Sequence, residues 1–155
     1  MKQALAFILF IFFSSCGGAG SPAKERSLST LMSDEYLHLL NQHRQELGLR
    51  PLLHAAEIEG VATQHSLKMS SGLTPFGHLG MSERCRKIKT LLGGGNLCGE
   101  IVARGQKTVE EVFRAWLNSP AHRRNLEEAR YTHTGLGFTQ AENGEIFWTE
   151  LFLEL

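Results

Sequence analysis

The chain has 155 residues, 42% of them hydrophobic, and its 16 Lys and Arg residues balance its 16 Asp and Glu residues. A chain of this length is expected to form one domain around a single core. The zero net charge, with acids and bases interspersed, argues against a nucleic-acid-binding protein, because such proteins concentrate positive charge on one face. Four cations gather within residues 84–89, and we interpret them as a solvated loop rather than a binding patch.

The N-terminal residues predict export. Residues 4–13 form an apolar run after a single Lys, as in a signal peptide, and the run is too short to cross a bilayer. Small residues and Cys16 follow, and this segment resembles the lipobox of bacterial lipoproteins, in which the cysteine carries the lipid. We therefore predict a signal peptide over residues 1–15, a lipidated Cys16 with a flexible linker over residues 16–30, and a folded domain over residues 31–155. Plain secretion without a lipid is the alternative.

Two helices are predicted at the start of the domain. The first is expected over residues 33–47, with Ser33 as its N-cap. The second is expected over residues 54–70 and contains Gly60, which costs about 1 kcal/mol relative to alanine and so suggests a close contact between helices. His65 lies on the apolar face of the second helix. We interpret it as a hydrogen-bonded core histidine rather than a ligand.

Export makes the two remaining cysteines informative. An oxidising compartment favours a disulfide between Cys85 and Cys98. A bridge over so short a loop would contribute about 3 kcal/mol. It would also tie the segment after His78 to the residue two before Glu100. A two-cysteine metal site is the alternative, but the sequence lacks the paired CxxC spacing of such sites.

A stretch in the second half of the chain places an acid and an imidazole at the two ends of an amphipathic helix. Thr108 is the predicted N-cap, and Pro120 ends the helix or begins a short new one with Ser119 as its cap. Apolar residues recur between them at helical spacing, namely Val109, Val112, Phe113, Trp116 and Leu117. We take Glu100 and His122 as candidate functional residues, since this helix can bring them close in space.

The C-terminal residues predict strands. Residues 134–140 and 146–155 are rich in β-branched and aromatic side chains, and Asn143-Gly144 between them is a type I′ hairpin signal. Both faces of the second run carry bulky apolar residues, so helices are expected on each side of the sheet. Residues 101–103 are a candidate third strand. The predicted fold class is α/β, a three-layer αβα sandwich in which Trp116 and Trp148 are core residues.

Seven motifs, in order along the chain, carry a resemblance to a known family. They are Asn41 with Arg44 and Gly48 to Leu52, then Ala62 with His65, Ser66 and Met69, then Phe76 to His78, then Gly99 to Ala103 with Gly105, then Ala115 to Leu126, then Tyr131 with Gly135 to Gly137, and then Trp148 to Phe152. This pattern resembles the bacterial branch of the CAP superfamily, named for cysteine-rich secretory proteins, antigen 5 and pathogenesis-related proteins, whose domain is also called SCP.

The resemblance implies a sandwich with a small, central, mostly antiparallel sheet and a surface cleft lined by two histidines and one or two glutamates. Position by position, His78 matches the first histidine, Glu100 the glutamate and His122 the second histidine. The second cleft glutamate of many relatives falls near Ser119 and is not assigned. Three other positions depart from the usual residues, with Gly77 in place of Ser, Val102 in place of Asn and Glu150 in place of Gln.

This trio of candidate residues can be interpreted in three ways. Two imidazoles and a carboxylate are the ligand set of a zinc site with one open position, so a divalent metal held by His78 and His122 is chemically reasonable. Without a metal, a histidine beside a glutamate has a raised pKa and can donate a proton or anchor a polar ligand group. The third interpretation is a structural hydrogen-bond cluster that fastens three loops together.

We expect an exported, lipid-anchored protein of the bacterial cell envelope that acts as a monomeric, non-enzymatic binding module through this cleft. Ser119 lies three residues before His122, but no GxSxG elbow accompanies it, and no complete acid, base and oxyanion set is evident. The resemblance allows sterols, fatty acids or protein partners as ligands. The alternative is a metal-dependent hydrolase, in which His78 and His122 hold a divalent ion and Glu100 is a ligand or the general base.

Overall fold

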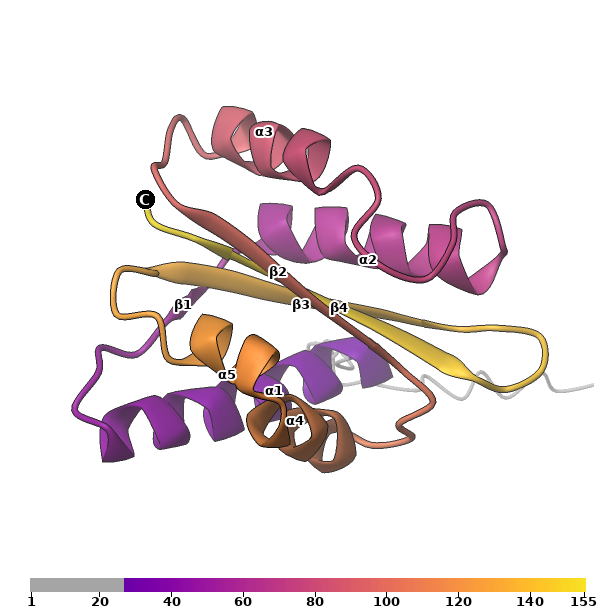
Figure 1. The fold of residues 1–155 in the computed structure, drawn as a ribbon, viewed down its shortest axis with the longest axis horizontal. Coiled ribbons are helices and arrows are strands. Elements are labelled where there is room, and N and C mark those ends of the chain that lie inside the picture. Colours follow the sequence, from indigo (N-terminus) through magenta and orange to yellow (C-terminus); the bar gives the residue numbers. More distant parts are fainter. Residues whose placement is uncertain (1–26) are drawn as a thin grey trace, which may run out of the picture.

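The computed structural model of the chain describes residues 27–155. Its elements in chain order are α1 (Leu28–Glu46), β1 (Leu53–His54), α2 (Ala56–Ser70), α3 (Met81–Leu91), β2 (Cys98–Arg104), α4 (Val109–Asn118), α5 (Pro120–Leu126), β3 (His133–Gln140) and β4 (Ile146–Leu153) (Figure 1). The strands form one sheet in the order β1-β3-β4-β2, in which β1 is parallel to β3 and the other pairs are antiparallel. The strand predicted at residues 101–103 is the centre of β2.

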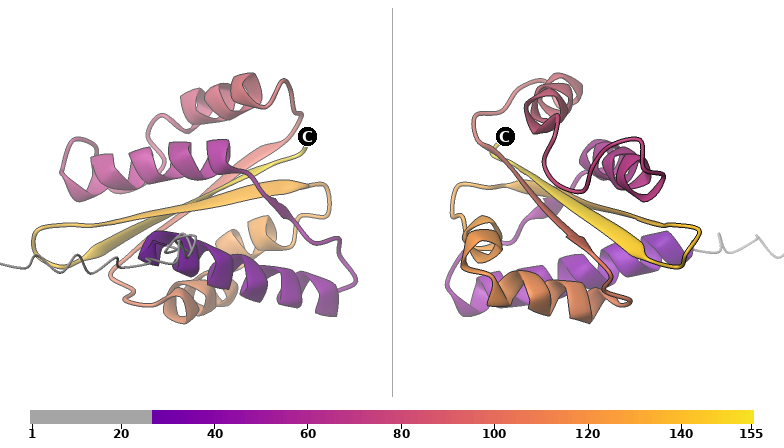
Figure 2. Two further views of the ribbon diagram at one scale, coloured as in Figure 1. Left: turned by 180° about the vertical axis from the view of Figure 1, so that it is seen from behind. Right: turned by 45° about the vertical axis from the view of Figure 1, so that its right-hand side comes forward.

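Helices cover both faces of this sheet. Helices α2 and α3 lie on one side, and α1, α4 and α5 lie on the other (Figures 1 and 2). The alternation of side chains along β4 explains this arrangement, because Trp148 and Phe152 enter the core under α1 and α4, whereas Leu151 and Leu153 enter the core under α2. The predicted three-layer α/β sandwich with a small, mostly antiparallel sheet is confirmed.

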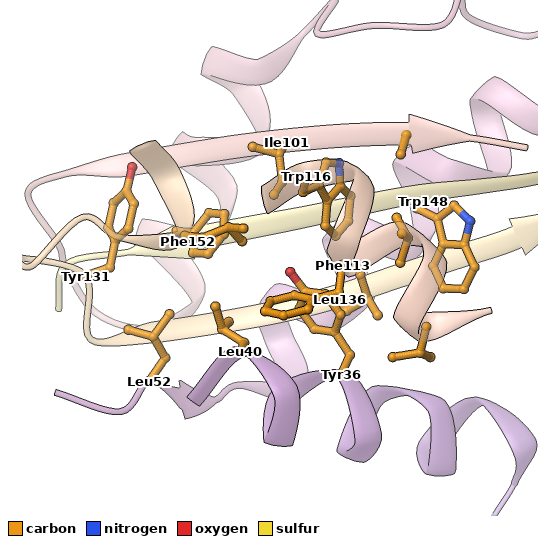
Figure 3. Close-up of a cluster of buried hydrophobic side chains, with 14 residues drawn as sticks. Tyr36, Leu40, Leu52, Ile101, Phe113, Trp116, Tyr131, Leu136, Trp148 and Phe152 are labelled. Atoms are coloured by element: carbon orange, nitrogen blue, oxygen red, sulfur yellow. The ribbon is translucent and has the colours of Figure 1, made fainter. Parts of the chain in front are cut away.

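Aromatic side chains fill the core on the α1 and α4 side (Figure 3). Trp116 and Trp148 are 1% and 0% exposed, which confirms both as core residues. The ring of Tyr36 meets the ring of Trp116 edge-on, with centroids 5.6 Å apart. Since edge-on aromatic pairs add to the free energy of burial, this core firmly fixes the position of α4 on the sheet.

The helix boundaries differ from the predictions at the start of α1. Helix α1 begins at Leu28, where the Ser27 side chain accepts a hydrogen bond from the N–H of Thr30. The predicted cap, Ser33, is instead a buried residue inside the helix, so that prediction was wrong. Helix α4 begins as predicted, with the hydroxyl of Thr108 accepting from the N–H of Glu111 at 3.2 Å.

The cations of residues 84–89 do not form a solvated loop, as the sequence had suggested. They lie on helix α3, which packs its Ile88 into the core beside α2. The helix turns one of the four cations, Arg84, toward the sheet, where its side chain is 13% exposed. Arg84 thereby reaches the buried carboxylate of Glu100.

The hairpin between β3 and β4 is confirmed, but its turn type is not the predicted one. Gln140 pairs with Ile146, so residues 141–145 form the connection. The N–H of Gly144 donates to the carbonyl of Ala141 at 2.9 Å, and only Gly144 in this connection has a positive φ, 84°. A type I′ turn would need positive φ at Asn143 as well. The connection is therefore a type I turn followed by a bulge at Gly144.

Close packing of α2 on the sheet depends on glycines of β3 rather than on Gly60. A Cβ atom at Gly60 would meet nothing within 4 Å, so the contact expected there does not exist. A Cβ at Gly135 would lie 2.3 Å from the backbone nitrogen of Glu59, and a Cβ at Gly137 would lie 2.0 Å from the backbone nitrogen of Thr63. The absence of two side chains on β3 therefore lets the α2 backbone approach the sheet.

A buried carboxyl group lies in the core on the α1 side. Glu150 is 0% exposed, and it accepts hydrogen bonds from the hydroxyls of Tyr36 and Thr134. Burial raises the pKa of Glu150 to about 8, and the two hydrogen bonds and the charge of Arg44 offset only part of that shift. Glutamine, which the family resemblance implies at this position, would be neutral at every pH.

We predict that Glu150→Gln stabilises the protein at high pH. The unfolded chain ionises Glu150 near its ordinary pKa of 4.5, whereas the folded chain keeps the proton up to about pH 8. Wild-type stability should therefore fall between these values as the pH rises. Denaturant titrations should give the variant an advantage of roughly 4 kcal/mol at about pH 8 and little advantage at about pH 4.5, because each unit of pKa shift corresponds to about 1.36 kcal/mol. An equal gain at both values, or the same gain from Glu142→Gln in the exposed hairpin loop, would contradict this assignment.

The predicted signal peptide and the lipidated Cys16 lie outside the described residues. Within residues 27–155, no helix combines the length and the apolar character needed to cross a membrane.

Candidate functional site

A cleft of about 480 Å³ lies between the loop after α2 and the junction of α4 with α5, along β2. Its apolar lining comes from Phe76, Val102, Ala103, Ala115 and Trp116, and its polar lining comes from His78, Arg104, Gln106, Ser119 and His122, together with the backbone of Gly77. The structure therefore brings His78 and His122 to one cleft, although they lie 44 positions apart in the sequence.

Glu100 lies beneath the cleft rather than in its lining. It pairs with Leu151 across the sheet, so its side chain points to the α2 and α3 face, where it is 5% exposed. There Oε1 is 2.9 Å from Nδ1 of His78. A carboxylate can only accept, so Nδ1 of His78 donates. Nε2 is then the nitrogen of His78 that remains available to a ligand.

Arg84 of α3 holds both oxygens of Glu100. Its Nε donates to Oε2 at 2.5 Å and its Nη2 donates to Oε1 at 2.7 Å. Its Nη1 donates to the carbonyl of Leu79 at 2.8 Å, which ties the loop that carries His78 to the same guanidinium. A bidentate arginine fixes the plane of a carboxylate as well as its charge. Arg84 therefore sets the orientation of Glu100 and, through it, of His78.

Sequence reasoning missed Arg84 because it treated four neighbouring cations alike. One signal in the sequence could have separated them. Cys85, Ile88 and Leu92 recur at helical spacing, which predicts a helix with an inward face. Arg84 lies one turn before Ile88 and shares that face, whereas Arg86 points to solvent.

His65 of α2 supports the site from below. It is 1% exposed, and its Nε2 donates to the carbonyl of Gly77 at 2.9 Å, which confirms it as a hydrogen-bonded core histidine. The same nitrogen lies 4.0 Å from Oε1 of Glu100. Burial lowers the pKa of His65, and the hydrogen bond to Gly77 offsets only part of that shift. His65 therefore acts as a neutral spacer that positions the backbone next to His78.

His122 is held on the other wall by helix α5. The C-terminal end of this helix is tied to α1, because Nη1 of Arg44 donates to the carbonyl of Leu126 at 2.6 Å. Burial, and secondly the charge of His78, lower the pKa of His122. The imidazole of His122 is therefore neutral at pH 7 and offers one donor and one acceptor to the cleft.

The geometry does not fit a metal site built from the whole trio. Within residues 27–155, no group of three or more His, Cys, Asp and Glu side chains is arranged to hold a metal ion. The reason is visible at Glu100, whose two oxygens are already bound by Arg84 and His78. Nε2 of His78 and the imidazole of His122 are the remaining donors, and two ligands are fewer than zinc sites in proteins use.

The predicted disulfide between Cys85 and Cys98 is confirmed. It joins α3 to the first residue of β2, and the two Cα atoms are 5.9 Å apart. Since both sulfurs are in the bond, the alternative of a two-cysteine metal site is excluded. The bridge flanks the ion pair of Arg84 and Glu100 on both elements and holds these elements together.

Loss of this disulfide should weaken the whole site. We expect the double variant Cys85→Ser with Cys98→Ser to unfold with a free energy lower by about 3 kcal/mol, because the unfolded chain is no longer cross-linked. Urea denaturation of the double variant and of the wild type with and without reductant would measure this. Reduced wild-type protein should match the double variant. If the reductant leaves the urea midpoint of the wild type unchanged, the bridge is not a stabilising element.

Comparison with known proteins agrees with this architecture. The sequence model of the cysteine-rich secretory protein family, CAP, matches residues 37–152. The chain is 34% identical over 119 residues to YkwD of Bacillus subtilis, an alignment that covers 76% of this chain and 45% of that protein. The chain thus spans less than half the length of this relative.

Two solved structures are similar in fold. One is an extracellular protein containing an SCP domain from Bacillus anthracis, with a TM-score of 0.70 and 26% identity over 90% of this chain and 45% of that chain. The other is an outer surface protein from Borrelia burgdorferi, with a TM-score of 0.66 and 24% identity over 78% of this chain and 90% of that chain. These two likenesses show the fold, and the family match over most of the sequence shows that the chain belongs to the cysteine-rich secretory protein (CAP) family.

Proposed function

We propose that the protein is an exported, lipid-anchored CAP domain that binds a ligand in the cleft between His78 and His122 without chemically changing it. The observation that carries this proposal is the immobilisation of Glu100. Arg84 and His78 donate to both of its oxygens, and its side chain is 0% exposed, so the carboxylate orients an imidazole and is shielded from substrate and water. The imidazole of His78, oriented by Glu100, and the neutral imidazole of His122 lie beside an apolar wall and are suited to hold a polar group of a ligand.

The position of Ser119 supports a non-catalytic cleft. Ser119 lines the cleft together with both histidines. An activated serine requires a base at about 2.6–3.2 Å. Within the described part of the chain, no hydrogen bond joins the hydroxyl of Ser119 to either imidazole. The metal-dependent hydrolase is less well supported, since Glu100 is not free to act as a ligand or a general base.

Export and lipid anchoring rest on the leader and on the relatives. The apolar run before Cys16 has the order of a lipoprotein signal, and the two similar structures are an extracellular and an outer surface protein. We expect the intact mass of the membrane-bound protein to correspond to a chain that begins at Cys16 and carries lipid. Cys16→Ser should move the protein from the membrane fraction to the soluble fraction. A wild-type protein that is already soluble would favour plain secretion.

A cleft-filling variant tests the binding function. Ala115 lines the cleft and is half-buried, whereas Ala121 is exposed on α5 outside the cleft lining. We expect native mass spectrometry of the purified full chain to detect a ligand from the envelope fraction with the wild type and Ala121→Trp, but not with Ala115→Trp. Equal capture by all three proteins would place binding elsewhere. A stoichiometric zinc ion that is lost in both His78→Ala and His122→Ala, together with hydrolysis of ester or peptide substrates, would favour the hydrolase instead.

A further inference from the structure

We propose that the ligand of the cleft is an extended peptide segment, which pairs with the outer edge of β2 as an additional strand. This inference rests on the proposed function and names the chemical class of the ligand. Its starting point is the position of β2, which is the last strand of the sheet and therefore has one edge without a neighbouring strand (Figure 2). That edge runs through the cleft, because Val102, Ala103 and Arg104 all line it.

The register shows which backbone groups of β2 point outward. The N–H of Gly105 donates to the carbonyl of Ile146 on β4 at 2.9 Å. In an antiparallel ladder, hydrogen-bonded pairs alternate with non-hydrogen-bonded pairs. Ala103 therefore faces β4, while the N–H and C=O groups of Val102 and Arg104 face away from the sheet. The indole of Trp116 agrees with this assignment, because its Nε1 donates to the outward carbonyl of Val102 at 3.3 Å.

The remaining outward groups have no partner in the described part of the chain. No hydrogen bond is formed there by the N–H of Val102 or by the N–H and C=O of Arg104. Val102 is 5% exposed, and an unpaired donor at a buried residue is costly. A further unpaired group lies just beyond the end of the strand, where the buried Oε1 of Gln106 lacks a hydrogen bond.

These unpaired groups match a peptide backbone better than an apolar lipid. An extended strand supplies C=O groups to the N–H groups of Val102 and Arg104, and N–H groups to the carbonyl of Arg104 and to Gln106. Strand addition to an open edge is a common form of peptide recognition. A sterol or fatty acid would leave most of these donors and acceptors unpaired, which would reduce its affinity.

The walls of the cleft indicate which side chains such a peptide would carry. Alternate residues of a strand point to opposite faces of the sheet. One set would meet Phe76, which is 42% exposed and packs against Phe147 on the α2 side. The other set would meet Ala115 on α4. The cation in the lining is Arg104, which lies over the ring of Phe76 at 5.0 Å and 3.9 Å from Glu145. We therefore expect a peptide with apolar and neutral residues to bind better than a basic one.

The test uses random dodecapeptides displayed on phage and selected for binding to the full chain. Phage that also bind the cleft-filling variant Ala115→Trp are removed. Enriched sequences are then made as capped peptides with single N-methyl groups along the backbone. We expect methylation at alternate residues to weaken binding about tenfold or more, because only every second amide faces β2. Methylation at the intervening residues should have a much smaller effect. Uniform sensitivity, or none, would overturn the proposed strand pairing.

A pair of variants at Arg104 tests the same contact from the protein side. Arg104→Pro removes the outward N–H, and proline is tolerated on the open side of an edge strand. Arg104→Ala removes the charged side chain but keeps the N–H. We expect peptide binding to be lost in the first and weakened less than tenfold in the second, which loses only the side-chain contribution, with both variants retaining the wild-type melting temperature within a few degrees. Should Arg104→Pro fail to fold, the N-methyl series on the wild type decides alone.

The two proposals can fail separately. If no peptide is enriched but Ala115→Trp still loses a captured non-peptide ligand, the cleft is a binding site and the peptide assignment is wrong. If no peptide is enriched and all three proteins capture the same material, both the proposed function and this inference are wrong.

Discussion

Replacing Arg84 by methionine should lower the free energy of unfolding by about 3–5 kcal/mol, because it leaves the buried carboxylate of Glu100 without its cationic partner. The Arg84 guanidinium donates two hydrogen bonds to this carboxylate, and the side chain of Glu100 is 0% exposed. Methionine has a similar length and keeps much of the packing, so the loss reports on the charge pair. Denaturant titration would measure the change in the free energy of unfolding. The NMR resonance of the His78 backbone amide should also shift, because His78 loses its fixed partner.

Two further variants separate this ion pair from the general effect of removing a cation. Arg86 lies on the same helix, but its ion pair with Glu83 is exposed to solvent. Arg86→Met should therefore remain close to the wild type. Adding Glu100→Gln to Arg84→Met should recover much of the lost stability, because an uncharged amide is less costly to bury than an unpaired carboxylate. If Arg84→Met and Arg86→Met are equally stable, Arg84 does not stabilise the buried carboxylate of Glu100.

Gly137→Ala should also be strongly destabilising, by about 3 kcal/mol or more, because the added methyl group has no space. Its Cβ would lie 2.0 Å from the backbone nitrogen of Thr63 and 2.5 Å from the Cα of Thr63. Backbone atoms of a helix cannot rotate away as a side chain can, so α2 would have to move off the sheet. Since α2 carries His65, this movement should disturb the loop that positions His78.

Gly60→Ala on α2 is the matched control. Its Cβ would meet nothing within 4 Å, and alanine is favoured over glycine inside a helix by up to about 1 kcal/mol. Thermal denaturation should therefore show a small rise in melting temperature for Gly60→Ala and a large fall for Gly137→Ala. A similar small change in both variants would mean that α2 is not held at the close distance described here.

The candidate site was partly predictable from the sequence. The family resemblance placed His78, Glu100 and His122 at cleft positions, and the structure brings the first two into contact and places the third on the opposite helix. The resemblance did not reveal that Glu100 is buried and that both of its oxygens already accept hydrogen bonds. That fact depends on Arg84, which lies 16 residues earlier and meets Glu100 only because α3 packs beside β2. The sequence therefore predicted three side chains that could bind a metal, whereas the structure leaves only the two histidines available.

The sequence by itself determined the features that arise between near neighbours. The cap of α4 at Thr108, the apolar faces of β4 and the hairpin near Gly144 each depend on residues within a few positions of one another, and helical period, strand period and turn chemistry are local properties. The disulfide was also predictable, because Cys85 and Cys98 are the two cysteines of the predicted folded domain and can pair only with each other. The turn type was not, because the register of the two strands sets the length of the connection.

Only the tertiary structure decided which residues meet across elements. It turned Arg84 inward while Arg86 on the same helix stayed in solvent, it made Gly137 rather than Gly60 the point of close approach, and it placed β2 at the open edge of the sheet. The physical reason is the same in each case. The free energy of a buried charge, a missing side chain or an unpaired backbone group depends on what packs against it, and those neighbours come from distant parts of the chain.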